Sequence, residues 1–337
     1  MRTALVGLVV LVALLTLYVP HLREAASVFE DDRMLTVTGA PWTARLTGRG
    51  LTHESWQWVR TPGASHALNL ALHGLTAFLV GLVLWQITQV SWIAGNGAAL
   101  VALHPLSVES VAYATSRAEL IAAVGALVAV SGVLRRWPVG LVLAAGGLWG
   151  AWLGKETGAV ALLLLPLTLW VRRDRRLEDA LWIMGGTVAL TSALWWPYAI
   201  TLPAIGEIPT AHIDPRSWGL IQASAVWRLV VLSVWPAWLS VSPDMPPSFW
   251  LGAWSAVLLA GLLESAWRAR HQAPLFTFGV LWCAVVAAPR FIVRTPLSPF
   301  NEHQWYLALP GVACCVLAGI EALAAHVEQW RGRPCPA

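Results

Sequence analysis

Charged residues are scarce in this sequence, and lysine occurs only once. Of its 337 residues, 12% are charged and 57% are hydrophobic. A soluble globular domain carries about 25% charged residues, so a water-soluble fold is excluded because it could not bury so much apolar surface. A spanning helix needs roughly 20 apolar residues, so the sequence predicts an all-α integral membrane protein with about ten crossings and no separate soluble domain.

Cysteines are also few, and the net charge is small. The four cysteines form no CxxC pair and have no histidine at ligand spacing, which excludes a zinc site and a disulfide framework and makes them apolar fillers. The charge of +4 is too small and too dispersed for nucleic-acid binding. Tryptophan, by contrast, is abundant, with 22 residues that often end apolar runs, as expected of rings at a membrane interface.

Ten apolar tracts predict helices, because backbone groups in lipid must be paired within their own segment. The first would also suit a signal peptide, but it is long for one and further spans follow, so we expect a retained helix. The tracts are 3–20, 66–88, 92–108, 117–134, 138–154, 157–171, 180–200, 249–267, 274–289 and 304–324.

Arginine clusters predict the orientation, because short basic loops stay in the cytoplasm. The clusters at 135–136, 172–176, 268–270 and 331–333 fall on one side if the N-terminus is cytoplasmic. Within a single polytopic domain over 1–337, the segments 21–65, 109–116, 155–156, 201–248 and 290–303 then face out. Many of them also carry arginines, which indicates an anionic substrate.

This topology requires the apolar stretch 217–238 to lie along the outer surface instead of crossing. Arg228 in its middle and Pro236 near its end suit an interfacial helix. We therefore expect 201–248 to be an outer loop that contains such a helix.

The first outer loop, 21–65, carries an acidic motif. Asp31 and Asp32 follow Glu30 close to the membrane surface. Adjacent carboxylates can act as a general base with an orienting or metal-binding partner. A solvated turn is the alternative interpretation, and a divalent cation at Asp31 and Asp32 stays open; no other cofactor is indicated.

Polar residues recur inside the second apolar tract. His66, Asn69 and His73 lie at i, i+3 and i+7 and therefore share one helix face. Such side chains either bond to neighbouring helices or line a cavity.

The third tract ends in a polar string. His104, Glu109, Arg117 and Glu119 lie within sixteen residues, bracketed by apolar sequence. Ionisable groups at such a depth are costly and usually functional. An internal ion pair between Arg117 and Glu119 is the alternative.

Cations recur in two further outer turns. Lys155 precedes Glu156, and a compact lysine charge suits a phosphate. Near the end, Arg290, Arg294 and His303 lie just outside the predicted membrane and could hold a phosphate headgroup. A surface ion-pair loop is the rival account.

Four segments together resemble a known family. They are Phe29–Asp32, the string HPLSVESVAYATSRAEL that starts at His104, the turn Gly154-Lys155-Glu156, and EHQWYLALPG from Glu302. From about residue 28 to 315, the chain resembles the membrane part of the TMTC-type protein O-mannosyltransferases and their bacterial relatives, in the GT-C superfamily. Eukaryotic members continue into tetratricopeptide repeats, which this sequence does not contain, so we expect a different acceptor selection.

The resemblance implies a GT-C-like fold with outer-face interfacial helices. It also implies an inverting enzyme that moves a sugar, expected to be mannose, from a polyprenyl or dolichyl monophosphate to an acceptor hydroxyl on the extracytoplasmic side. Asp31 is the expected base and Asp32 the second choice. A phosphate leaving group needs cations, expected to be Arg117, Lys155, Arg290, Arg294 and His303. The expected substrate pocket consists of His66, Asn69, His73, His104, Glu109, Glu119, Glu156, Glu302 and Tyr306.

Other interpretations stay open. A transporter or flippase for a lipid-linked sugar would need similar cations, although transporters often show internal repeats that are not visible here. A catalytically inactive scaffold that keeps the fold is the third interpretation. The acceptor could be protein, lipid or polysaccharide, and the sugar another hexose or an aminoarabinose-like sugar. Short outer loops favour a bacterial inner membrane, with membrane lipids around the protein and the site facing the periplasm.

Overall fold

The computed structural model describes residues 49–172, 214–240, 248–292 and 301–331, and a few isolated positions in the predicted helices 3–20 and 180–200. All regular structure in these residues is helical. Six helices are long and apolar enough to cross a membrane, which is the pattern of a multi-pass integral membrane protein. Together with the 3₁₀ turns that adjoin α7, α12 and α14, they are α4 (Pro62–Thr88), α7 (Arg117–Val133), α11 (Pro215–Val234), α12 (Phe249–Arg268), α13 (Pro274–Ile292) and α14 (Leu309–Arg331).

Three shorter helices occupy predicted crossings. They are α5 (Ser91–Leu103), α8 (Val139–Gly154) and α9 (Ala161–Arg172). At 1.5 Å per residue they are roughly 18–24 Å long, less than the ~30 Å hydrocarbon core of a bilayer. The described residues therefore support six crossings by length and composition, and the expected ten stay a prediction.

The sequence predicted one helix over 92–108, but the structure divides this tract. Its α-helix ends at Leu103, and His104 is extended, with φ −70° and ψ 127°. Pro105 is the cause, because a proline pushes the residue before it out of the helical region. A 3₁₀ turn, η2 (Pro105–Ser107), and the short α6 (Val108–Ala112) follow.

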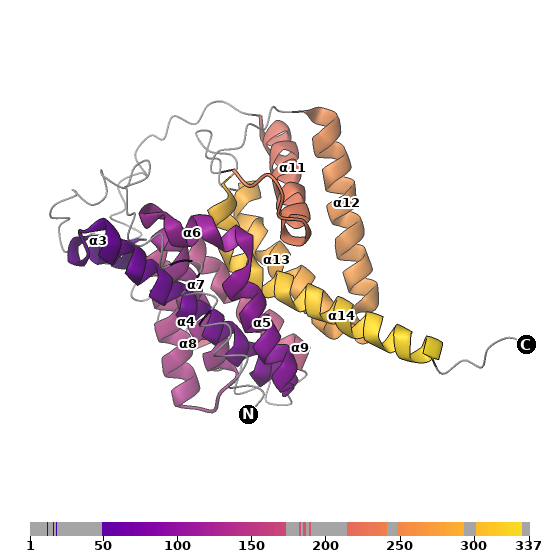
Figure 1. Cartoon of the computed structure of the whole chain (residues 1–337), viewed down its shortest axis with the longest axis horizontal. Coiled ribbons are helices and arrows are strands. Elements are labelled where there is room, and N and C mark those ends of the chain that lie inside the picture. The colour runs from indigo at the N-terminus through magenta and orange to yellow at the C-terminus, as the bar shows by residue number, and fades with distance from the viewer. Residues whose placement is uncertain are drawn as a thin grey trace, which may run out of the picture.

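The helices form two groups joined by a central pair (Figure 1). In the first group, α4, α5, α7, α8 and α9 pack together, with α3 (Gly50–Trp58) against α7 and α8. In the second, α11 and α12 lie side by side. The central pair α13 and α14 contacts both groups, with α13 against α9 and α11, and α14 against α5.

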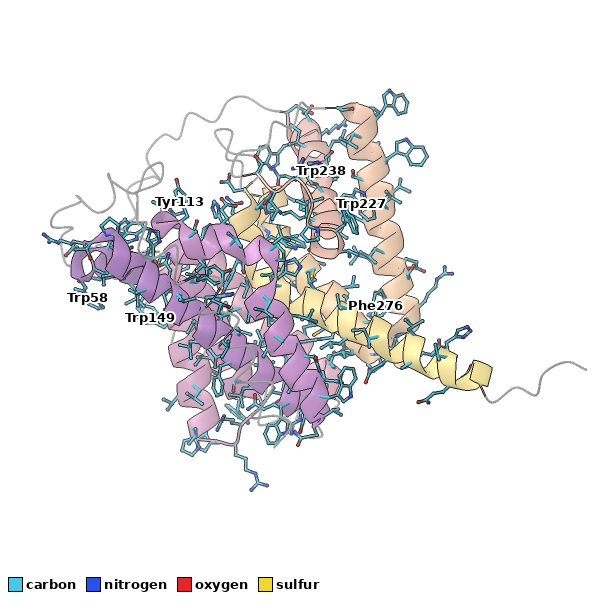
Figure 2. All side chains as sticks on the ribbon, in the orientation of Figure 1. Trp58, Tyr113, Trp149, Trp227, Trp238 and Phe276 are labelled. Atoms are coloured by element: carbon cyan, nitrogen blue, oxygen red, sulfur yellow. The ribbon has the colours of Figure 1, made fainter. Side chains whose placement is uncertain are left out.

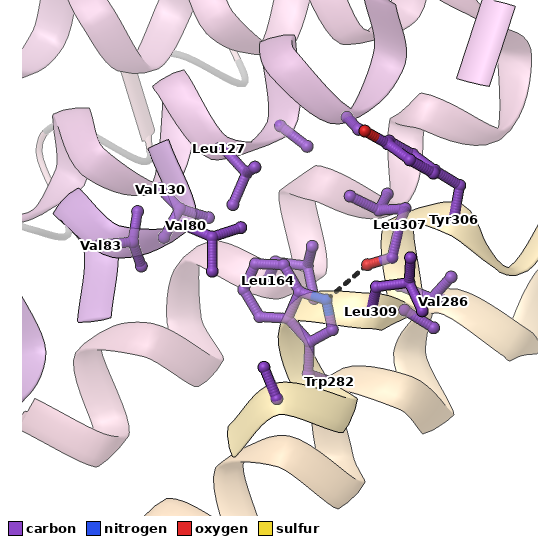
Figure 3. Close-up of a cluster of buried hydrophobic side chains, with 14 of the residues drawn as sticks. Val80, Val83, Leu127, Val130, Leu164, Trp282, Val286, Tyr306, Leu307 and Leu309 are labelled. Carbon is purple, nitrogen blue, oxygen red and sulfur yellow. Dashed lines mark hydrogen bonds between the residues drawn. The ribbon is translucent and has the colours of Figure 1, made fainter. Parts of the chain in front are cut away.

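Apolar side chains from distant segments fill the centre (Figure 3). Leu127, Val130 and Leu164 are fully buried, and Trp282 is 1% exposed. The Trp282 indole N–H donates to the carbonyl oxygen of Leu307 at 2.8 Å, so the buried ring leaves no polar atom unmet.

Small residues let α7 and α8 approach closely. A Cβ atom on Gly147 would lie 2.4 Å from the backbone nitrogen of Ala129, and one on Gly125 would lie 2.2 Å from that of Ala151. Such backbone contact is how helices pack where lipid removes the hydrophobic drive for association.

Residues of three predicted cytoplasmic arginine clusters, 135–136, 172–176 and 268–270, lie close together at one end of the bundle. Trp170 of α9 stacks on Trp267 of α12, with ring centroids 6.2 Å apart, and the Arg270 guanidinium lies 4.8 Å from the Trp267 ring. Arg172 donates to the carbonyl oxygen of Leu134, just after α7. The grouping agrees with the predicted topology, whereas the direction relative to a membrane stays a prediction.

Helix α11, expected along the outer surface, is also long and apolar enough to span. At its start, Trp218 Nε1 donates to the carbonyl oxygen of Arg290 at 2.9 Å. At its end, Ser233 Oγ accepts from Trp305 Nε1 at 3.0 Å. Just beyond α11, Trp238 is 86% exposed, as a ring at a membrane interface would be (Figure 2). The interfacial placement stays a prediction.

Candidate functional site

Most of the described residues expected in the site lie at one end of the helix bundle. Successive helices run in alternate directions, so the start of α4, the end of α5, the start of α7 and the end of α8 meet there. The end of α13 and the 3₁₀ turn η6 (Glu302–Ala308) join them. We call this region the polar end; its central members are Asn69, Glu109, Arg117, Glu119, Lys155, Arg290, Glu302 and His303.

Arg117 lies at the base of the polar end and is 0% exposed. Its Nε donates to Asn69 Oδ1 at 2.8 Å, and its Nη1 donates to Ser55 Oγ at 3.2 Å. Its Nη2 donates to the hydroxyl and the carbonyl oxygen of Ser65. The guanidinium therefore ties α7 to α3 and α4, and these contacts favour a positioning role over direct phosphate contact.

Lys155 and Glu119 form a buried ion pair. Lys155 Nζ donates to Glu119 Oε1, and the two side chains are 10% and 6% exposed. Glu119 thus pairs with Lys155, whereas an ion pair with Arg117 was the alternative that the sequence offered. Arg290 is also close enough to Glu119 for a favourable electrostatic interaction, and its Nη2 donates to the carbonyl oxygen of Asn301 at 3.1 Å. Two cations therefore converge on one carboxylate.

Glu109 and His303 form a second pair, across 194 residues of sequence. Glu109 Oε1 lies 2.6 Å from His303 Nδ1, and Glu109 Oε2 accepts from the His303 backbone N–H at 2.8 Å. The carboxylate thereby fixes the orientation of the imidazole, as a carboxylate does in other His–acid pairs.

A cavity of about 220 Å³ lies beside this pair. Glu302 on its wall is 3% exposed, and its Oε1 accepts from the Ser240 backbone N–H at 3.0 Å. The lining residues are Pro105, Leu106, Val108, Glu109, Ala112, Tyr113, Leu239, Ser240 and Glu302.

An apolar groove of about 440 Å³ lies between α11, α12, α13 and α14. Ser233, Val234 and Trp305 line the groove. The same two chain segments continue into the cavity, where Leu239, Ser240 and Glu302 line the wall. The groove and the cavity, which has Glu109 and Glu302 in its wall, are thus lined by the same two chain segments, 233–240 and 302–305.

Several expected pocket residues hold helices together instead. Asn69 Nδ2 donates to the carbonyl oxygens of Val111 and Tyr113. The His73 ring bonds through Nδ1 to the Tyr306 hydroxyl at 2.7 Å and through Nε2 to the carbonyl oxygen of Ala102 at 3.0 Å. Both side chains are 0% exposed, so they bond to neighbouring helices and do not line the cavity.

His66 and His104 lie at the margins of the polar end. His66 is 9% exposed near the start of α4. His104 accepts from the Leu106 backbone N–H on Nδ1, and its Nε2 lies 3.1 Å from the carbonyl oxygen of Ser233. Burial lowers the pKa of His104, and the bond to Ser233 opposes this effect in part.

Glu156 lies on the surface, away from the cavity. Its carboxylate pairs with Arg49 at 3.0 Å, with side chains 47% and 44% exposed. Burial and the Arg49 cation lower the pKa of the neighbouring His53, whereas Glu156 raises it. An exposed pair of this kind contributes little to stability.

The expected catalytic acids Asp31 and Asp32 lie outside the described residues, as does Arg294. Among the positions that the structure describes, no group of three or more His, Cys, Asp or Glu side chains could hold a metal ion. A divalent cation at Asp31 and Asp32 therefore stays a prediction. Cys283, Cys314 and Cys315 are free and lie on α13 and α14, as expected of apolar fillers.

Sequence reasoning missed some of the partners. Ser65 lies four residues before Asn69, so its place on the same helix face could have been read from the spacing. Ser55, Leu239 and Ser240 carried no such signal, because the fold alone brings them to the site.

Comparison with protein-family models, curated proteins and solved structures finds no match for this chain.

Proposed function

We propose that the chain is a membrane glycosyltransferase that moves a sugar from a polyprenyl monophosphate carrier to an acceptor hydroxyl. The single observation that carries this proposal is the apolar groove that shares two chain segments with a cavity whose wall carries Glu109 and Glu302. A lipid-linked sugar has a long hydrocarbon chain and a polar head, so it requires two such compartments in contact.

The cations of the polar end supply the second support. In the proposed reaction, the bond between the anomeric carbon and the phosphate oxygen breaks, and its electron pair leaves with the lipid phosphate. Lys155 and Arg290, already next to each other around Glu119, would stabilise that charge. Arg117 would hold α3, α4 and α7 in place around the site without touching the donor.

The acceptor hydroxyl attacks the anomeric carbon and loses its proton to a base. Asp31 is the proposed base, with Asp32 as the second choice, following the family resemblance. The displacement forms one carbon–oxygen bond and breaks one, so it inverts the anomeric centre in a single step.

A donor carrying a radiolabelled sugar tests the proposal in proteoliposomes. Transfer predicts label covalently joined to an acceptor and free polyprenyl phosphate in equal amount. A panel of mannosyl, other hexosyl and aminopentosyl donors, offered with membrane lipid and peptide acceptors, covers the open identities. Intact donor that crosses the bilayer with no labelled product would instead identify a transporter. The absence of both transfer and transport would identify an inactive scaffold.

A further inference from the structure

The cavity at Glu109 and Glu302 is acidic, although the chain as a whole is basic. Glu109 and Glu302 line it, whereas no lysine or arginine does. Lys155 and Arg290, the proposed partners of the donor phosphate, are not among its lining residues, so the cavity would take the sugar and not the phosphate.

Glu302 has an unused hydrogen-bonding position. Its side chain is nearly fully buried, and Oε1 accepts one bond, from Ser240 N–H. No donor from the described part of the chain reaches Oε2. Because Glu302 lines the cavity, a cationic ligand that brings an N–H group to Oε2 would form a charge-assisted hydrogen bond there.

The neighbours of Glu302 limit what such a ligand can be. Glu109 lies close enough to repel it electrostatically, and Arg228 attracts it while donating to the carbonyl oxygen of Trp238. His303 is the only described side chain that bonds to Glu109. A cationic donor between the two acids would relieve their repulsion, whereas a phosphate there would meet two negative charges.

The rest of the wall suits a sugar ring. Tyr113 offers an aromatic face, which attracts cations, and Leu106 and Leu239 offer apolar contact. At about 30 Å³ per water, the 220 Å³ holds roughly seven waters, the scale of one ring.

We infer that this cavity selects an amino sugar, with Glu302 and Glu109 binding its protonated amine. The inference rests on the proposed function, since it names the class of sugar that the transferase recognises. The ammonium could belong to the donor sugar or to a sugar on the acceptor, and the arms of the test separate these two sources.

Matched pairs of substrates test the inference with the intact protein in nanodiscs. The donor pair is a polyprenyl-phosphate amino sugar and its counterpart with a hydroxyl in place of the amine. The acceptor pair consists of the corresponding methyl glycosides. We expect an amine preference of about tenfold or more in kcat/KM within one pair, and N-acetylation should abolish it. The pair that shows the preference identifies the source.

Glu302→Gln keeps the size of the side chain and removes its charge. It should reduce the amine preference to within about twofold of unity, whereas Glu264→Gln, on the exposed surface of α12, should leave it unchanged. Equal use of both members in both pairs by the wild type, or an undiminished preference in Glu302→Gln, overturns the inference and leaves the transferase proposal intact.

Direct binding keeps the inference testable without turnover. If the protein transfers sugar from none of the donors, the transferase proposal fails. Calorimetric titration with the amino and hydroxyl methyl glycosides then decides whether the cavity still selects the amine. Selective amine binding supports the cavity assignment, and equal or absent binding of both glycosides refutes it. The ligand series needs no variant, so misfolding of Glu302→Gln cannot obscure the result.

Discussion

The buried pair of Lys155 and Glu119 allows structural and functional effects of the polar end to be separated. Lys155→Met leaves the Glu119 carboxylate buried without its direct partner, and breaking a buried pair in this way costs about 3–5 kcal/mol. Arg290 still attracts Glu119, so we expect a loss at the lower end, about 3 kcal/mol. In Lys155→Met/Glu119→Leu both charges are gone, and stability should return to within about 1 kcal/mol of the wild type.

Thermal unfolding of the purified protein, followed by tryptophan fluorescence, measures this difference. At about 2 °C per kcal/mol for a chain of this size, the single variant should melt roughly 6 °C lower and the double variant within about 2 °C of the wild type. Donor binding should stay weak in the double variant, because Lys155 is still missing from the phosphate site. Equal melting temperatures of the two variants would refute the buried pair, and wild-type donor binding by the double variant would remove Lys155 from the donor site.

Three further predictions concern single residues. Gly147→Leu should separate α7 from α8, since even a Cβ atom there would lie 2.4 Å from the Ala129 nitrogen; wild-type yield and melting temperature of that variant would contradict the close packing. Because burial lowers the pKa of His104 below its ordinary value of 6.5, the ring is neutral at pH 7 and its stabilising contribution is lost as the pH falls below that value. The wild type should therefore lose more melting temperature than His104→Gln between pH 7.5 and 5.5, and equal losses would contradict this assignment. Asp31→Asn should abolish sugar transfer at an unchanged melting temperature, and undiminished transfer would exclude Asp31 as the base.

The helical membrane fold was the part most open to prediction from sequence. Lipid leaves an apolar segment no alternative to a helix, so α7 and α8 begin and end within a residue of the predicted tracts. The exception at 92–108 has a local cause, because hydropathy continues through Pro105 while the backbone cannot. The helices α5 and α9 are shorter than the apolar tracts that predicted them, because apolar composition does not fix helix length.

The site was predicted in its residue types and less well in its pairings. Spacing placed Asn69 and His73 on one face, but it did not reveal that Arg117 bonds to Asn69 or that Tyr306 bonds to His73. Such contacts join helices far apart in sequence, and no local pattern encodes them. For the same reason the ion pair of Glu119 with Lys155 was not predicted, and Glu119 was expected in the substrate pocket with an Arg117 pair as the alternative.

The most direct test of the account is to map where a lipid-phosphate sugar binds. A polyprenyl-phosphate sugar with a photoreactive group on its lipid chain, cross-linked to the protein in nanodiscs, should label peptides of α11, α12, α13 and α14 that line the apolar groove. Competing unlabelled donor should abolish this labelling. Labelling confined to other helices, or labelling that excess donor does not reduce, would contradict the claim that the groove and the cavity at Glu109 and Glu302 together hold the donor.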